Sequence, residues 1–115
     1  MIYLFYGENE FEKRRAIVKL IGDEKVARHD GEDLTLAGMQ EIAIRQTLFM
    51  NSSVYLISKL GENSEVWSQL PDMKFDDDRT IILVEDKIDK RSTVYKSISK
   101  IVELYEFKAI AAKDS

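Results

Sequence analysis

A glycine and a lysine near the start of the chain are spaced like those of a phosphate-binding loop. Gly7 and Lys13 occupy the first glycine and the lysine of the pattern G-x-x-x-x-G-K-[ST]. Glu12 stands where the second glycine would let backbone amides approach phosphate, and Arg14 replaces the hydroxyl that binds magnesium. A carboxylate there would repel the anion. We therefore interpret the segment as a strand-to-helix turn in which Asn9 caps the helix and Glu12 completes a capping box.

An acidic pair follows the most convincing strand pattern in the chain. Residues 80–86, TIILVED, resemble the aliphatic strand and terminal acids that hold magnesium in nucleotide hydrolases, with Glu85 and Asp86 in the acidic places. The chain has no phosphate loop to hold a nucleotide beside this pair. Acidic residues at strand ends are also mostly solvated. We therefore expect no metal site and no cofactor.

A phosphoacceptor receiver domain is a further possibility, because it has the same alternation of strands and helices. A receiver needs an aspartate at the end of its third strand, where this chain has Ser58 and Lys59, although Lys108 could match the receiver lysine. His29 has no recognisable Ser or Cys nucleophile to accompany it, and we expect it at a water-exposed strand end. Trp67 is expected to be a packing residue. No set of residues here supports an enzyme.

The spacing of apolar residues predicts the elements that position these side chains. Strands are expected at residues 2–6, 25–31, 53–60, 80–86 and 103–110, and helices at 9–22, 32–46, 62–72 and 90–102. Inner helix faces are assigned to Phe11, Ile17, Val18 and Ile21, then Leu36, Met39, Ile42 and Ala43, and finally Val94, Ile98 and Ile101. Asp33 is the expected cap of the second helix, and Pro71 is expected to break the third.

Five strands alternating with four helices predict an α/β fold of three layers around a mainly parallel sheet with right-handed crossovers. Ligands of such sheets bind beyond the carboxyl ends of the strands. No repeat or linker divides the sequence, so residues 1–115 are expected to form one domain. No helix follows the last strand to cover the sheet, which suggests a domain excised from a longer chain.

Composition narrows the classes of function. The 115 residues are 44% hydrophobic and 33% charged, with no cysteine and one histidine, which excludes disulfides and thiolate chemistry. A net charge of -4 argues against strong duplex-DNA binding by this chain alone. No apolar run reaches the length of a membrane span, and residues 1–7 look like a strand rather than a secretion signal. We expect a cytoplasmic protein.

Residues 45–53, RQTLFMNSS, contain an apolar run between polar ends. If the second helix continued through this run, Phe49 would lie within about 20° of Ile42 on the inner face. Leu48 follows Met39 by nine residues, about 180° around the same helix, and would point away from the sheet. At least one of the pair is therefore expected to be exposed, as an apolar projection that a partner's pocket accepts.

Three segments together resemble the amino-terminal domain of the delta subunit of the bacterial DNA polymerase III clamp loader. They are YLFYGENEFEKRRAI at residues 3–17, RQTLFMNSSVYLIS at 45–58 and DKRSTVYKSISKIVELYEF at 89–107. Their order and spacing extend the resemblance over essentially the whole chain. It implies a P-loop NTPase-like domain related to AAA+ ATPases with a degenerate phosphate loop. It also implies a non-catalytic subunit that grips the ring-shaped sliding clamp and opens one of its interfaces.

The resemblance also assigns a site and partners. The family's clamp-binding element is an apolar pair at the end of a helix before the third strand, which here corresponds to Leu48 and Phe49. Thr47 and Met50 are the expected flanking contacts. Other loader subunits are expected to bind through lid and collar domains that this chain lacks, and DNA is expected to be contacted indirectly in the full complex.

Two functions of other classes stay open at this point. One is a small nucleotide or phosphate enzyme that uses Gly7, Lys13 and Glu85, and the other is a receiver-like signalling domain.

Overall fold

Five strands form one parallel sheet in the computed structural model, which describes residues 1–44, 54–76 and 79–108. The strands are β1 (Ile2–Tyr6), β2 (Val26–Asp30), β3 (Val54–Ser58), β4 (Thr80–Glu85) and β5 (Glu103–Glu106), in the spatial order β2-β3-β4-β1-β5. All four neighbouring pairs are parallel; Leu4 of β1, for example, lies opposite Leu83 and Leu104. The predicted parallel sheet is confirmed.

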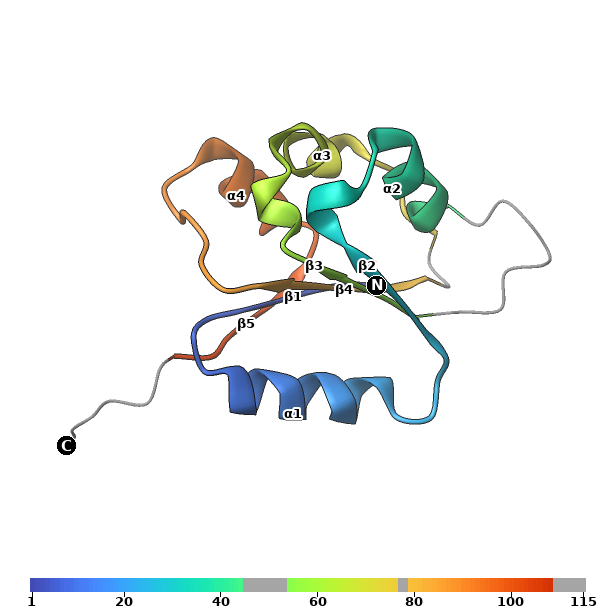
Figure 1. Cartoon of the computed structure of the whole chain (residues 1–115). Helices are drawn as coiled ribbons and strands as arrows, with labels where there is room; N and C mark the ends of the chain where they lie inside the picture. Colours follow the sequence, from blue (N-terminus) through green and yellow to red (C-terminus); the bar gives the residue numbers. More distant parts are fainter. Residues whose placement is uncertain (45–53, 77–78, 109–115) are drawn as a thin grey trace.

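Helices cover both faces of the sheet and make three layers (Figure 1). The helix α1 (Glu10–Ile21) lies on one face, whereas α2 (Leu36–Ala43), α3 (Ser64–Gln69) and α4 (Thr93–Ile98) lie on the other. Three short 3-10 turns, Gly31–Asp33, Leu60–Glu62 and Leu70–Asp72, complete the connections. None of the helices in the described ranges is long and apolar enough to cross a bilayer.

The hydrophobic core is divided by the sheet, because successive residues of a strand point to opposite faces. In β4, Ile81 and Leu83 pack beneath α2–α4, whereas Ile82 packs on the α1 side with Phe5 and Ile17. The larger cluster lies on the face with three helices, and it includes Leu4, Met39, Ile57, Leu60, Leu70 and Ile98, each at most 1% exposed. The sheet is therefore buried on both faces along its central strands.

The inner face of α1 differs from the predicted one. Ile17 is buried and Ile21 is half-buried, as expected, but Phe11 and Val18 are 65% and 64% exposed. The helix instead buries Lys13, which lies one turn before Ile17. Phe11 is two residues from Lys13, about 200° around the helix, so burying the lysine turns the phenylalanine to the surface.

The second predicted helix begins later and ends earlier than expected. Asp33 belongs to a 3-10 turn, and the actual cap of α2 is Thr35, whose Oγ1 accepts the Gly38 N–H at 3.0 Å. A hydroxyl at this position satisfies one of the free amides of the first turn. The predicted stripe of Met39, Ile42 and Ala43 is buried, which confirms that part of the pattern.

The later helices follow the pattern more closely. The α-helix α3 ends at Gln69, just before Pro71, which lies in the 3-10 turn that follows, so the predicted break at this proline is confirmed. Ile98 is buried and Val94 is half-buried, as expected, but Ile101 lies beyond the end of α4 and is 39% exposed.

The orientation of α1 predicts opposite results for two adjacent residues. Ile17→Ala removes buried methyl groups and should lower the free energy of unfolding by about 2–4 kcal/mol. Val18→Ala truncates an exposed side chain in a helix and should change it by less than about 0.5 kcal/mol. Urea denaturation of both variants measures the difference. Equal losses would contradict the observed rotation of the helix.

Candidate functional site

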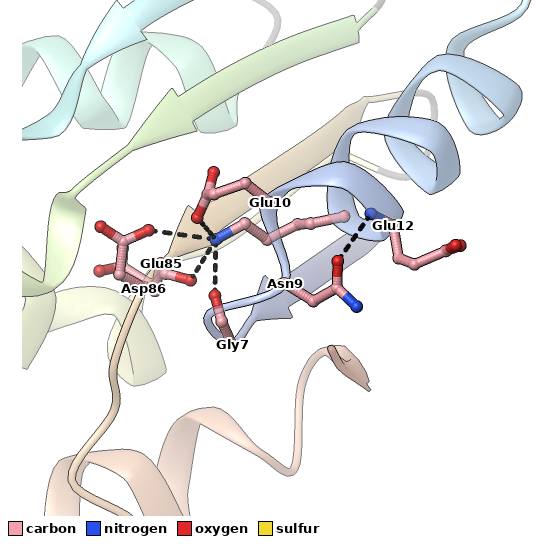
Figure 2. Close-up of polar contacts among 7 residues, drawn as sticks. Gly7, Asn9, Glu10, Glu12, Glu85 and Asp86 are labelled. Carbon is pink, nitrogen blue, oxygen red and sulfur yellow. Dashed lines mark hydrogen bonds and ion pairs between the residues drawn. The ribbon is translucent and has the colours of Figure 1, made fainter. Parts of the chain in front are cut away.

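The carboxyl ends of β1 and β4 meet at the topological switch point of the sheet, which we call the crevice. After β1 the chain passes to α1 on one face, and after β4 it passes to α4 on the other, so the two connections diverge. Such a switch point is where open parallel sheets bind ligands. The crevice contains Gly7, Lys13, Glu85 and Asp86, the residues singled out by the phosphate-loop and acidic patterns, and Figure 2 shows its polar contacts.

The ammonium group of Lys13 occupies the centre of this crevice. Its Nζ donates to the carbonyl oxygens of Gly7 at 2.9 Å and Glu85 at 3.1 Å, and to Asp86 Oδ1 at 3.1 Å. Glu10 Oε2 lies 2.9 Å away, so four oxygens converge on one nitrogen (Figure 2). Lys13 is only 1% exposed. The three N–H donors of this ammonium group are already bonded to protein oxygens, whereas a lysine that binds phosphate keeps its donors free for the ligand.

This contact changes the acid-base behaviour of Asp86. The hydrogen bond from Lys13 lowers the pKa of the Asp86 carboxyl below its ordinary value. A charge-assisted bond of this kind favours the ionised carboxylate. The positive charge of Lys13 is therefore balanced by carboxylates at the surface of the crevice.

Two backbone amides of the turn after β1 are also engaged. The Gly7 N–H donates to the Glu85 carbonyl at 3.2 Å, and the Asn9 N–H donates to the Phe107 carbonyl at 3.1 Å. Gly7 adopts φ +128°, and a Cβ at this position would lie 2.1 Å from the Phe107 oxygen. Glycine is therefore required for the close approach of this turn to the chain after β5. A phosphate cradle needs free amides, and those of Gly7 and Asn9 are already bonded to carbonyl groups.

The helix cap explains part of this arrangement. Asn9 Oδ1 accepts the Glu12 N–H at 3.1 Å, as the capping pattern predicts. The reciprocal half of the capping box is not formed, because the Asn9 N–H bonds to Phe107 and the Glu12 carboxylate lies 3.4 Å from Arg15. The cap is therefore a single side-chain bond.

Glu85 points to the opposite face of the sheet from α1. It is 4% exposed, and its Oε2 accepts the Gly61 N–H at 3.0 Å. Burial raises the pKa of Glu85 to about 7, although the amides of Gly61 and Leu60 favour the charged form. The carboxyl is therefore close to half-protonated at neutral pH. The contact between Gly61 and Glu85 was not predicted from the sequence, in which a glycine just after a strand was its only sign.

A cavity of about 530 Å³ lies beside Glu85, at the carboxyl ends of β3 and β4. Its lining is formed by Lys59, Gly61, Glu62, Trp67, Glu85, Asp86, Lys87, Ile88, Asp89, Ser92 and Val94. Trp67 packs against the larger core cluster, as predicted, and also borders this cavity. The side chains of α3 and α4 thus form one wall and the strand ends the other.

The residues considered for a receiver domain do not gather into a site of that kind. Ser58 ends β3, as predicted, and supplies a hydroxyl where a receiver needs a carboxylate. Lys59 and Lys108 are both exposed. His29 was expected at an exposed strand end, but it is half-buried within β2, where its ring stacks on Tyr55 at 6.2 Å. Packing on a neighbouring strand accounts for its position.

The predicted clamp-binding residues Thr47, Leu48, Phe49 and Met50 lie outside the described residues. The elements before and after them in the chain, α2 and β3, are described. The helix α2 ends at Ala43, and β3 begins with the buried Val54 at the amino-terminal edge of the sheet. The Lys13 crevice lies at the opposite edge.

The fold is a three-layer α/β domain with a parallel sheet, and the lysine at the meeting point of β1 and β4 is bound by the protein itself. No known protein family matches the chain, and no curated protein matches it. Among solved structures, it is similar to the DNA clamp loader delta protein of Bacillus subtilis (YqeN), with a TM-score of 0.62 and 19% sequence identity. The match covers 98% of this chain and 40% of that protein, so the chain spans less than half of its length.

Replacing the buried ammonium should destabilise the domain. Lys13→Met keeps the length of the side chain but leaves the Gly7 carbonyl oxygen without its donor, at a cost of about 1–3 kcal/mol in the free energy of unfolding. Arg15→Met is the matched control, because its ion pair on the same helix is exposed and worth less than about 0.5 kcal/mol. Urea denaturation gives both values, and a Lys13→Met protein as stable as the wild type would contradict a structural role.

The raised pKa of Glu85 predicts a specific pH dependence of stability. Between about pH 4.5 and pH 7 the folded protein keeps a proton that the unfolded chain has released, so stability falls as pH rises. Glu85→Gln cannot titrate. The wild type should therefore lose about 2–3 kcal/mol relative to this variant across that range. Denaturation curves at several pH values measure the difference, and parallel profiles would show that Glu85 titrates normally.

Proposed function

We propose that this chain is a non-catalytic clamp-loader domain that binds the sliding clamp of bacterial DNA polymerase III through Leu48 and Phe49. Thr47 and Met50 flank the contact. The observation that carries the proposal is the similarity of fold, over 98% of the chain, to a clamp loader delta protein. The resemblance of residues 45–58 to the clamp-binding segment of that family supports the choice of site.

The state of the crevice supports a non-catalytic role. The lysine that would hold a nucleotide phosphate is bonded to four protein oxygens, and the amides of Gly7 and Asn9 donate to carbonyl groups. ATP hydrolysis is therefore assigned to other subunits of the loader. In this proposal the chain is the first domain of a longer cytoplasmic protein, which joins those subunits and reaches DNA within the complex.

The elements before and after the proposed contact, α2 and β3, are each anchored in the fold. The Ile44 N–H closes the end of α2 on Gln40 at 3.1 Å, and the Asp76 N–H donates to the Ala43 carbonyl at 2.9 Å. On the other side, Val54 is 5% exposed in β3. A binding segment held between two anchored elements loses less freedom on association.

The proposed mechanism is a hydrophobic wedge. Burial of Leu48 and Phe49 in a pocket of the clamp contributes about 1.5–3 kcal/mol for each side chain before the cost of ordering. Binding opens the ring only if the clamp's open or strained form is bound more tightly than its closed form. The free energy for opening then comes from this difference in affinity.

Truncation of both wedge residues should abolish most of the clamp affinity. The Leu48→Ala, Phe49→Ala double variant should bind a bacterial sliding clamp at least about 100-fold more weakly, because both anchors are lost. Its thermal midpoint should stay close to that of the wild type if the side chains are exposed. Surface plasmon resonance and thermal denaturation measure the two quantities.

A matched control separates binding by Leu48 and Phe49 from nonspecific hydrophobic binding. Phe11→Ala, Val18→Ala removes two apolar side chains that are 65% and 64% exposed on α1, and clamp affinity should not change. An equally stable wedge variant that still binds the clamp would remove the site assignment. A wild type that does not bind any sliding clamp would reject the proposed function.

A further inference from the structure

We propose that the cavity beside Glu85 is a binding site for an organic cation, a guanidinium or alkylammonium group carried on an apolar stem. This site is independent of the clamp contact. It lies at the carboxyl edge of the sheet, whereas the elements that flank residues 45–53 meet at the amino edge.

The carboxyl group of Glu85 provides the specific contact. It is 96% buried, and the Gly61 N–H holds it from the side of the 3-10 turn at 3.0 Å. A Cβ on residue 61 would lie 2.8 Å from Glu85 Oε1, so a larger residue there would displace the carboxyl group from this position. A buried carboxylate fixed by a backbone amide is a strong acceptor for an N–H donor that enters the cavity.

The charges around the cavity favour a cation over an anion. Its charged groups come from the end of β3 and the following turn (Lys59, Glu62), from β4 (Glu85) and from the connection to α4 (Asp86, Lys87, Asp89). Four of these groups are acids and two are bases; Asp86 already pairs with Lys13, which leaves three acids against two bases. A phosphate would meet the buried acid at the wall of the cavity, which opposes binding of an anion.

The walls favour an organic cation over a metal ion. In the part of the chain that the structure describes, no three His, Cys, Asp or Glu side chains are close enough to hold a metal. The cavity instead has an apolar wall of Trp67, Ile88 and Val94. Aliphatic stems pack on such a wall, and an aromatic ring attracts a guanidinium. A volume of about 530 Å³ fits a small ligand or one long side chain.

Protonation of Glu85 gives the site a pH dependence. The pKa of the empty site is about 7, and a cation binds the ionised carboxylate. The fraction of protein ready to bind therefore rises about tenfold from pH 6 to pH 8, and the apparent affinity should rise with it.

The single tryptophan of the chain makes the test direct. Trp67 fluorescence is recorded while N-ethylguanidinium is added to the whole chain, and N-ethylurea serves as the neutral probe of the same shape. The variants are Glu85→Gln and, as the matched control, Glu65→Gln, which removes an exposed acid on α3 outside the lining. A capped Gly-Arg-Gly peptide is titrated in parallel to distinguish a partner's arginine from a free small molecule.

We expect a saturable change in Trp67 fluorescence with N-ethylguanidinium. The cation should bind about tenfold more weakly to Glu85→Gln and equally well to Glu65→Gln. We also expect weaker binding at pH 6 than at pH 8, and little response to N-ethylurea. Tighter binding of the peptide would identify a protein side chain as the ligand, and tighter binding of the free cation would identify a small molecule. Equal binding by wild type and Glu85→Gln, or no saturable response to either cation, would overturn the proposal. Neither result bears on clamp binding.

Discussion

The buried ammonium of Lys13 is the interaction on which the arrangement of this domain depends. A charge removed from water is costly unless oxygens replace its hydration, and here they come from two backbone carbonyls and two carboxylates. These oxygens belong to the turn after β1, the first turn of α1 and the end of β4. One side chain thus joins β1, its neighbour β4 and the helix α1.

This constraint decides how the surface of α1 is used. The helix presents Lys13 and Ile17 to the sheet, so Phe11 and Val18 remain in solvent. The same contact occupies the switch point, where open parallel sheets bind ligands. On the side of α3 and α4, the carboxyl edge of the sheet keeps the cavity beside Glu85.

Local patterns in the sequence predict much of the fold, but they do not predict contacts between distant segments. The run of four aliphatic residues in β4 and the Asn9 cap are properties of neighbouring residues, and both were correctly expected. The exposure of Phe11 was not, because hydrophobic periodicity assumes that a lysine faces water. The pairing of Glu85 with Gly61 joins residues 24 apart, and no local pattern predicts it. The assignment of Leu48 and Phe49 stays a prediction that rests on resemblance.

The order of strands in the sheet has a consequence for how this chain folds. The strand β1 lies inside the sheet and is made before the other four, yet its neighbours are far along the sequence: Ile2 lies opposite Ile81, and Tyr3 lies opposite Glu103. During synthesis β1 therefore waits for β4 and β5 before it is enclosed. Such non-local pairing slows folding, since a long loop must close before its contacts form. The strand β5 thus completes the environment of β1.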